Sequence, residues 1–188
     1  MIAGKPLYAW SLAQAIESQC FDEIYVLTNS EKIRGNINRK FSAMVTVLDR
    51  LAENCTDTAS TESAMLEFQE RIPFDVVCLI QATSPLTKAA DFRAAKQKFI
   101  NEQLDSLLTA VISKRFFWTR ESEPINYDPN NRPRRQDFDG CHMENGAFYM
   151  TRSQILKNQA CRLGGRIGIH EMVAETAVEI DEETDWVI

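Results

Sequence analysis

Apolar and polar positions alternate with two different periods along the first two thirds of the chain. Apolar residues at helical spacing, or a polar stretch following a capping signal, predict helices. Short β-branched apolar runs predict strands between them. The predicted helices cover residues 6–18, 31–40, 58–71 and 88–100, and the predicted strands cover residues 24–28, 44–48, 76–80 and 106–112. This alternation predicts an α/β fold with a doubly wound, mostly parallel sheet.

The run Val76–Ile80 is apolar without interruption. Such a run is typical of a parallel strand that is covered on both faces. In open α/β sheets, ligands bind beyond the carboxyl ends of the strands. We therefore expect the site to include the residues that directly follow the strands.

The pattern changes after residue 112. Residues 113–144 are interpreted as an extended arm or insertion. The segment contains the aromatic run Phe116, Phe117 and Trp118, and residues 121–139 are polar and rich in Pro, Asn and Arg. Beyond the arm, the sequence predicts a strand over 146–150, a helix over 153–158, strand segments over 167–172 and 177–180, and a closing helix over 184–188. No repeat or second domain is recognised, so residues 1–188 are predicted to form one domain.

Composition excludes several classes of function. The formal net charge of −6 argues against a nucleic-acid partner, and no apolar run has the length of a membrane-spanning helix. The five cysteines are odd in number and include no CxxC pair, which favours free thiols in a reducing compartment. Only two histidines occur, far apart, so a zinc site is not expected.

Polar residues follow two of the predicted strands. Gln81 comes directly after the run ending at Ile80, and its amide group offers both a donor and an acceptor. Arg50 follows the strand ending at Leu48, ahead of a hydroxyl-rich helix start at residues 57–61 whose backbone N–H groups suit polar ligand atoms. An ordinary turn at Gln81 and a well-capped helix at 57–61 are the alternatives.

Three further segments have chemical potential. Residues 132–136 are rich in Arg, whose guanidinium groups pair with carboxylates and phosphates. Asn145 and Tyr149 lie four apart in a predicted strand and so share a face. Glu179 and Asp181 point to one side of an extended segment and could hold Mg²⁺ through water and phosphate. The alternatives are solvated surface charges and an ordinary strand edge.

Taken in order, six stretches of the chain resemble the acylneuraminate cytidylyltransferases (CMP-sialic acid synthetases), especially those of the animal type. They are IAGKPL, TDTAST, LIQATSPL, RPRRQDFDG, ENGAFYM and VEIDEETDW. The resemblance implies a Rossmann-like fold of the nucleotide-diphospho-sugar transferase type. It implies transfer of CMP from CTP to a sialic-type sugar acid, with Mg²⁺ and release of pyrophosphate. It also implies a homodimer, and a cytoplasmic location, or a nuclear one for the animal type.

The resemblance assigns roles to individual residues. It implies catalytic roles for Gln81, Arg135 and Asp181, and Mg²⁺ binding by Glu179 and Asp181. The residues it places around the cytidine and the sugar acid are Arg50, Ala59, Thr61, Gln81, Arg135, Asn145 and Tyr149. It implies that the arm reaches across a homodimer, so that Arg135 serves the neighbouring subunit and pairs with the sugar carboxylate.

The chain also departs from the family pattern. Position 179 is Glu where the family usually has Asp, and Thr87 stands where an Arg is common. An apolar strand and a basic, glycine-rich triphosphate loop are expected before Ile2. That strand would lie between 24–28 and 76–80, and unpaired backbone groups cost about 1–3 kcal/mol each. We therefore expect the chain without it to be poorly stable or to close its sheet differently, and to lack most of its grip on the triphosphate.

Two alternatives remain open. The first keeps the fold and changes the substrate to Kdn, 3-deoxy-manno-octulosonate or pseudaminate. The second is a non-catalytic homologue that binds a nucleotide or a partner chain.

Overall fold

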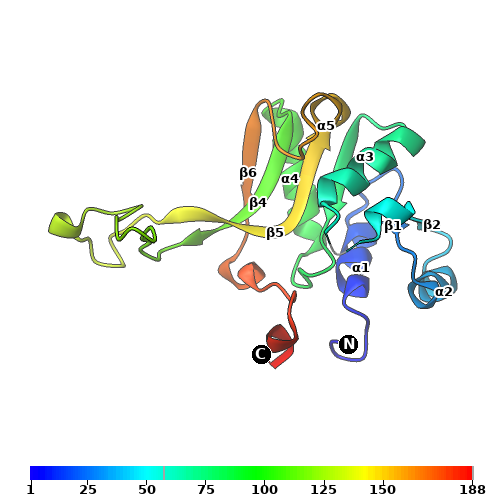
Figure 1. The fold of residues 1–188 in the computed structure, drawn as a ribbon, viewed down its shortest axis with the longest axis horizontal. Coiled ribbons are helices and arrows are strands. Elements are labelled where there is room, and N and C mark those ends of the chain that lie inside the picture. The colour runs from blue at the N-terminus through cyan, green and yellow to red at the C-terminus, as the bar shows by residue number, and fades with distance from the viewer. Residues whose placement is uncertain (57, 188) are drawn as a thin grey trace.

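A computed structural model describes residues 1–56 and 58–187. Asp57, in the predicted hydroxyl-rich helix start, and Ile188, in the predicted closing helix, lie outside the described residues. Helices cover a mixed sheet, and one long projection leaves it at the side (Figure 1).

The main sheet has the strand order β3-β5-β4-β6. Its strands are β3 (Val76–Ile80), β4 (Ser106–Ser113), β5 (Cys141–Arg152) and β6 (Ile167–Glu171). Strand β5 runs antiparallel to both β3 and β4, whereas β4 and β6 are parallel. The prediction of a mostly parallel sheet is therefore wrong, because the chain leaves β4 through the arm and returns beside it as a hairpin rather than through a crossover helix.

Two further strands form a separate sheet. β1 (Tyr25–Leu27) and β2 (Thr46–Leu48) pair in parallel with each other. Within the part of the chain that the structure describes, no ladder joins β1 to β3. The expected strand between them stays a prediction.

The most deeply buried strand of the main sheet is β4, whereas the sequence predicted a buried strand at 76–80, which is β3. Six of the eight residues of β4 are buried, and the other two are partly buried. In contrast, β3 lies at the outside of its sheet, and the side chain of Val76 is 39% exposed. The expectation that 76–80 is covered on both faces is therefore wrong, because an apolar run does not reveal whether a strand is central or outermost.

Five predicted helices are confirmed, with small differences in their ends. They are α1 (Tyr8–Ser18), α2 (Glu31–Lys40), α3 (Thr61–Arg71), α4 (Ala89–Asn101) and α5 (Ser153–Gln159). The core joins α1 and α4 to the sheet, with Phe92 of α4 packed on Phe148 of β5 at a centroid distance of 4.6 Å. None of the helices among residues 1–56 and 58–187 could cross a membrane.

The predicted strand over 177–180 is absent from the described chain. The structure has the 3₁₀ turn η3 (Ala174–Ala177) followed by irregular backbone. Ile180 is bonded to the loop that follows β3: its N–H donates to the carbonyl oxygen of Thr83 at 2.9 Å. A second 3₁₀ turn, η4 (Glu183–Val187), replaces the predicted closing helix.

The arm projects far from the sheet, as Figure 1 shows. At its base β4 and β5 remain paired as far as Ser113 opposite Cys141. Further out, Phe116 packs against Tyr127 and Phe138 at centroid distances of 4.3 and 5.0 Å, and the Arg132 guanidinium lies 4.5 Å from the Phe116 ring. The arm thus has its own small aromatic cluster.

Candidate active site

Three segments that are far apart in sequence meet at one end of the sheet. The backbone N–H of Gln81 donates to the carbonyl oxygen of Ala147 at 3.0 Å, which holds the loop after β3 against β5. The Ile180 bond to Thr83 brings the Glu179–Asp181 segment to the same loop. The structure therefore gathers the predicted residues Gln81, Asn145, Tyr149, Glu179 and Asp181 in one region.

Helix α1 fixes the loop that carries Gln81. The hydroxyl of Ser11, which is buried on this helix, lies 3.4 Å from the carbonyl oxygen of Gln81 and 3.3 Å from that of Ser84. One turn further along, the side-chain oxygen of Gln14 accepts a hydrogen bond from Ala89 N–H at 2.8 Å, at the start of α4. Both ends of the loop are thus tied to one rigid helix.

Asn145 is buried at the centre of this region, with an exposed fraction of 1%. Its Nδ2 donates to the hydroxyl and carbonyl oxygens of Thr176, at 3.0 and 3.3 Å. Its Oδ1 is buried and has no hydrogen-bond partner among the described residues. A buried acceptor without a partner is costly, so such an atom is a reasonable place for a ligand to donate a hydrogen bond.

Tyr149 is held at both ends of its side chain. Its hydroxyl donates to Oε1 of Glu144, and the guanidinium of Arg162 lies 4.8 Å from the ring centroid. Burial, followed by the hydrogen bond and charge of Glu144, raises the pKa of Tyr149 well above its usual value. The phenol therefore stays protonated and acts as a hydrogen-bond donor at neutral pH.

Glu179 lies in a negative environment. Burial, and then the charges of Asp181 and Glu144, raise the pKa of the Glu179 carboxyl. Its carboxylate occupies the space beside Gly146 that a Cβ at this position would need, and Gly146 has a φ of +63°. A cation would relieve this repulsion, so the local charge fits Mg²⁺.

The two carboxylates would supply only part of a magnesium shell. Across residues 1–56 and 58–187, no three His, Cys, Asp or Glu side chains are grouped to hold a metal. Mg²⁺ is commonly bound by one or two carboxylates, with phosphate and water completing the octahedron. The residues present therefore fit a magnesium ion that is bound together with a nucleotide.

Ala59 and Thr61 lie at the start of α3, and Arg50 follows β2. The Arg50 backbone is fixed by Asn29, which accepts from its N–H at 2.8 Å and donates to its carbonyl oxygen at 3.2 Å. Nε of Arg50 is buried without a partner in the described chain. Ser60 caps α3 by accepting from the N–H of Ser63 at 3.1 Å, so the capped-helix interpretation also holds here.

An ion pair links the α3 start to Tyr149. Glu62, next to Thr61 in the first turn of α3, accepts a hydrogen bond from Nε of Arg162 at 2.6 Å. Arg162 carries no motif and lies in a loop after α5, so the sequence offered no signal for it.

Arg135 is not brought to this region within the chain. It is exposed in a turn on the arm and makes no hydrogen bond or ion pair with the other predicted site residues among those described. Its neighbour Arg134 pairs with Asp137 at 2.6 Å. A role for Arg135 across a dimer stays a prediction.

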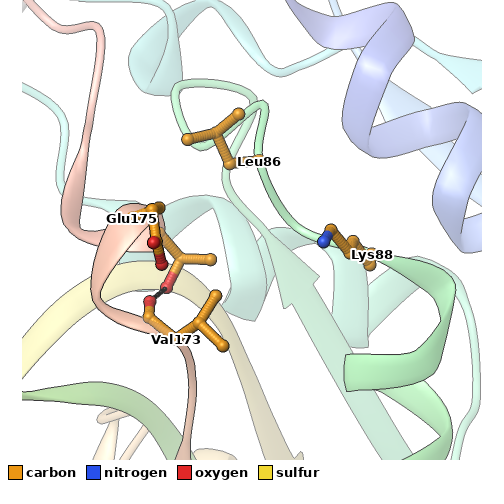
Figure 2. A pocket seen from close by; sticks show the side chains of 5 residues that line it. Leu86, Lys88, Val173 and Glu175 are labelled. Atoms are coloured by element: carbon orange, nitrogen blue, oxygen red, sulfur yellow. Dashed lines mark hydrogen bonds between the residues drawn. The ribbon is translucent and has the colours of Figure 1, made fainter.

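A pocket of about 470 Å³ opens beside the site (Figure 2). Its lining residues are Leu86, Lys88, Val173, Glu175 and Thr176. None of the predicted site residues lines it, although its lining residue Thr176 accepts a hydrogen bond from Asn145. The candidate site is therefore the region where the three segments meet, and the pocket lies outside it.

The fold is an α/β fold of the nucleotide-diphospho-sugar transferase type. Two solved structures share the fold. A 4-diphosphocytidyl-2C-methyl-D-erythritol synthase from Anaerococcus prevotii has a TM-score of 0.68 at 13% identity, covering 100% of this chain and 88% of that one. A CMP:2-keto-3-deoxy-manno-octonic acid synthetase complexed with CTP has a TM-score of 0.66 at 16% identity, covering 93% and 82%.

The cytidylyltransferase family model matches residues 1–185, so the chain belongs to the cytidylyltransferase family. An N-acylneuraminate cytidylyltransferase of Oncorhynchus mykiss is 34% identical, with 99% of this chain and 44% of that protein covered. A pseudaminic acid cytidylyltransferase of Campylobacter jejuni is 31% identical, with 80% and 69% covered. The chain thus spans less than half the length of the fish protein.

Proposed function

We propose that this domain transfers CMP from CTP to a sialic-type nonulosonic acid and releases pyrophosphate. The observation that carries the proposal is the convergence of Gln81, Asn145 and Glu179 at one end of the sheet. The similarity to N-acylneuraminate cytidylyltransferases over 99% of the chain supports the choice of substrate.

In the proposed reaction, the anomeric hydroxyl oxygen of the sugar acid forms a bond to the α-phosphorus of CTP. The bond from that phosphorus to the bridging oxygen of the β-phosphate breaks, pyrophosphate leaves, and the hydroxyl proton is lost. When bound, Mg²⁺ neutralises phosphate charge, and Glu179 and Asp181 would hold it. Gln81 and the unpartnered Oδ1 of Asn145 would orient the sugar acid by hydrogen bonds.

The start of α3 would receive the nucleotide. Arg50 has a buried Nε without a partner in the described chain, and a guanidinium suits phosphate or cytosine oxygens. Ala59 and Thr61 would form the adjoining wall. We further propose that Arg135 reaches the sugar carboxylate of a second copy, because the arm carries it away from its own sheet (Figure 1).

The test is incubation of the purified protein with CTP, Mg²⁺ and N-acetylneuraminate, followed by measurement of CMP-sugar and pyrophosphate. We expect both products in equal amounts, and none from Asp181→Asn or in the presence of EDTA. The absence of CMP transfer to any sugar acid by the folded wild-type protein would refute the proposal and favour a binding role.

A second candidate is transfer to pseudaminate, favoured by the similarity to the Campylobacter jejuni protein. Competition of pseudaminate, Kdn and 3-deoxy-manno-octulosonate with N-acetylneuraminate separates the substrates. The sugar acid with the highest kcat/KM identifies the natural substrate class.

Sharing of Arg135 between subunits has its own test. Arg135→Ala and Asp181→Asn are each expected to abolish turnover. If the arm completes the partner's site, a mixed dimer of these variants regains one native site, and random pairing restores about a quarter of wild-type activity. No recovery after proven subunit exchange would place Arg135 in its own subunit's site or outside any site.

A further inference from the structure

Four side chains form a continuous chain of contacts beside the candidate site. Glu62 pairs with Arg162 at 2.6 Å, the Arg162 guanidinium covers the ring of Tyr149 at 4.8 Å, and the Tyr149 hydroxyl donates to Glu144. The Glu62 and Arg162 side chains are only 24% and 18% exposed. These contacts join the first turn of α3, the loop after α5, and the two segments of β5 that lie before and after Asn145 and Gly146.

Arg162 is chemically suited to hold an aromatic ring in place. A guanidinium is planar, so it can stack on an aromatic face while its N–H groups bond to a carboxylate. The bond to Glu62 fixes the Nε edge of Arg162 and leaves the guanidinium over the ring. Glu144 fixes the other end of Tyr149, so the ring is restrained at two points.

We propose that Arg162 is a positioning residue for the sugar acid: it acts through Tyr149 and does not itself touch the substrate. This inference rests on the proposed function and adds to it a residue that the sequence did not indicate. Under the proposed function Tyr149 is one of the residues around the sugar acid, and its contacts with Glu144 and Arg162 fix where its phenol group lies. Release of the Tyr149 ring would let that group move away from the sugar acid.

The nucleotide side should be much less affected, because α3 has other anchors. Gln69, near the end of this helix, donates to the carbonyl oxygen of Ser153 at 2.8 Å. Glu67 accepts hydrogen bonds from Asn54 at 2.7 Å and from Leu51 N–H at 3.0 Å. Loss of the Glu62–Arg162 pair therefore frees Tyr149 but leaves the helix in place.

The first test compares Arg162→Met with wild type in steady-state assays with N-acetylneuraminate and CTP. A cation–π contact is worth about 0.5–2 kcal/mol, which corresponds to a roughly two- to thirtyfold rise in the KM for the sugar acid. The KM for CTP should change less than about twofold. Arg162→Lys keeps the charge and part of the contact, and Glu62→Gln keeps the guanidinium, so both variants should have KM values between those of wild type and Arg162→Met.

Arg152 provides a matched control in the same protein. Its guanidinium lies 5.4 Å from the Phe99 ring and it pairs with Asp105 at 3.6 Å, at the far end of β5. Arg152→Met removes the same kinds of contact, so it should lower the melting temperature without raising the KM for the sugar acid. An equal rise in KM from both variants would overturn the proposal.

A double-mutant cycle with Tyr149→Phe separates positioning from direct contact. If Arg162 acts by holding the phenol, its replacement adds little once the hydroxyl is gone, and the two effects are less than multiplicative. Multiplicative effects would mean that Arg162 contacts the substrate itself, which overturns the positioning role. A wild-type protein that transfers CMP to no sugar acid overturns both proposals, whereas an active one whose Arg162→Met variant keeps its KM overturns this one alone.

Discussion

The substitution Gly146→Ala adds one methyl group and should change both the free energy of unfolding and the proposed binding of Mg²⁺. It has a φ of +63°, and a Cβ there would overlap the Glu179 carboxylate. Placing Ala in a left-handed conformation costs roughly 1–2 kcal/mol. Since Glu179 can rotate away, we expect Gly146→Ala to lower the free energy of unfolding by about 1–2 kcal/mol, a sizeable share of the typical 5–15 kcal/mol.

The functional consequence follows from the same overlap. Displacement of the Glu179 carboxylate removes one of the two proposed magnesium ligands, so the Mg²⁺ concentration for half-maximal turnover should rise. Urea unfolding measures the stability change, and a magnesium titration at saturating CTP measures the second effect. In a Glu179→Ala background, Gly146→Ala should still cost the backbone strain but should no longer change the magnesium requirement.

Gly35 is the matched control. It lies inside α2, where an added Cβ would meet nothing within 4 Å and the backbone conformation is ordinary. Gly35→Ala should stabilise the chain by about 0.5–1 kcal/mol, because Ala is the better helix former. A change of stability in the same direction for both substitutions would contradict the assigned strain at Gly146. An unaltered magnesium requirement in a destabilised Gly146→Ala variant would contradict the proposed role of Glu179 as a magnesium ligand.

Three further predictions concern buried polar groups. Asn145→Ala should lower stability by about 1–2 kcal/mol in urea unfolding, since it removes the bonds to Thr176. Burial is the main reason why the pKa of the Glu179 carboxyl lies above its ordinary value of 4.5. Ionisation of Glu179 therefore costs the folded state more than the unfolded state, and wild type loses this stability as the pH rises. The Glu179→Gln variant cannot ionise, so its stability relative to wild type should increase from about pH 4 to pH 7. Burial opposes ionisation of Glu67, but hydrogen bonds from Asn54, Leu51 and Arg71 outweigh this effect and lower the pKa of the Glu67 carboxyl. The ionised carboxylate therefore stabilises the fold at neutral pH, and Glu67→Gln should destabilise the chain there. This loss of stability should become smaller as the pH falls through 4.5 and below, where wild-type Glu67 is protonated. An unchanged stability difference across pH would contradict either assignment.

Local patterns predicted the helices and the placing of Gln81. The apolar stripe predicted over residues 88–100 matches the buried residues Ala89, Phe92, Ala95 and Phe99 of α4, because helical period and burial have the same cause. Its last member, Ile100, is exposed, so the stripe was predicted one residue too long. Gln81 was expected at a ligand-binding strand end, and it does bond to the backbone beside Asn145 and Gly146. Strand termini can be recognised in the sequence, and the rule about ligands then predicts where a site should lie.

The direction of β5 could not be predicted in the same way. An apolar strand pattern is identical in both directions, and the long arm concealed that β4 and β5 form a hairpin. The contact of Arg162 with Tyr149 was also inaccessible, since it joins a loop to a strand without any local motif. Arg135 poses a different problem, because its predicted partner would belong to another copy of the chain.

The exchange of Asp for Glu at position 179 illustrates how a departure from a family pattern is resolved by tertiary structure. A longer side chain moves the carboxylate, and Mg²⁺ tolerates little misplacement of its ligands. In this fold the Glu179 carboxylate lies on the open face of Gly146, which any side chain would fill. The space that Gly146 leaves matters beside its positive φ, because the Glu179 carboxylate occupies it. The two positions should therefore be considered together: Gly146 leaves room for the Glu179 carboxylate, and a larger residue at 146 would require the proposed metal-binding segment to shift.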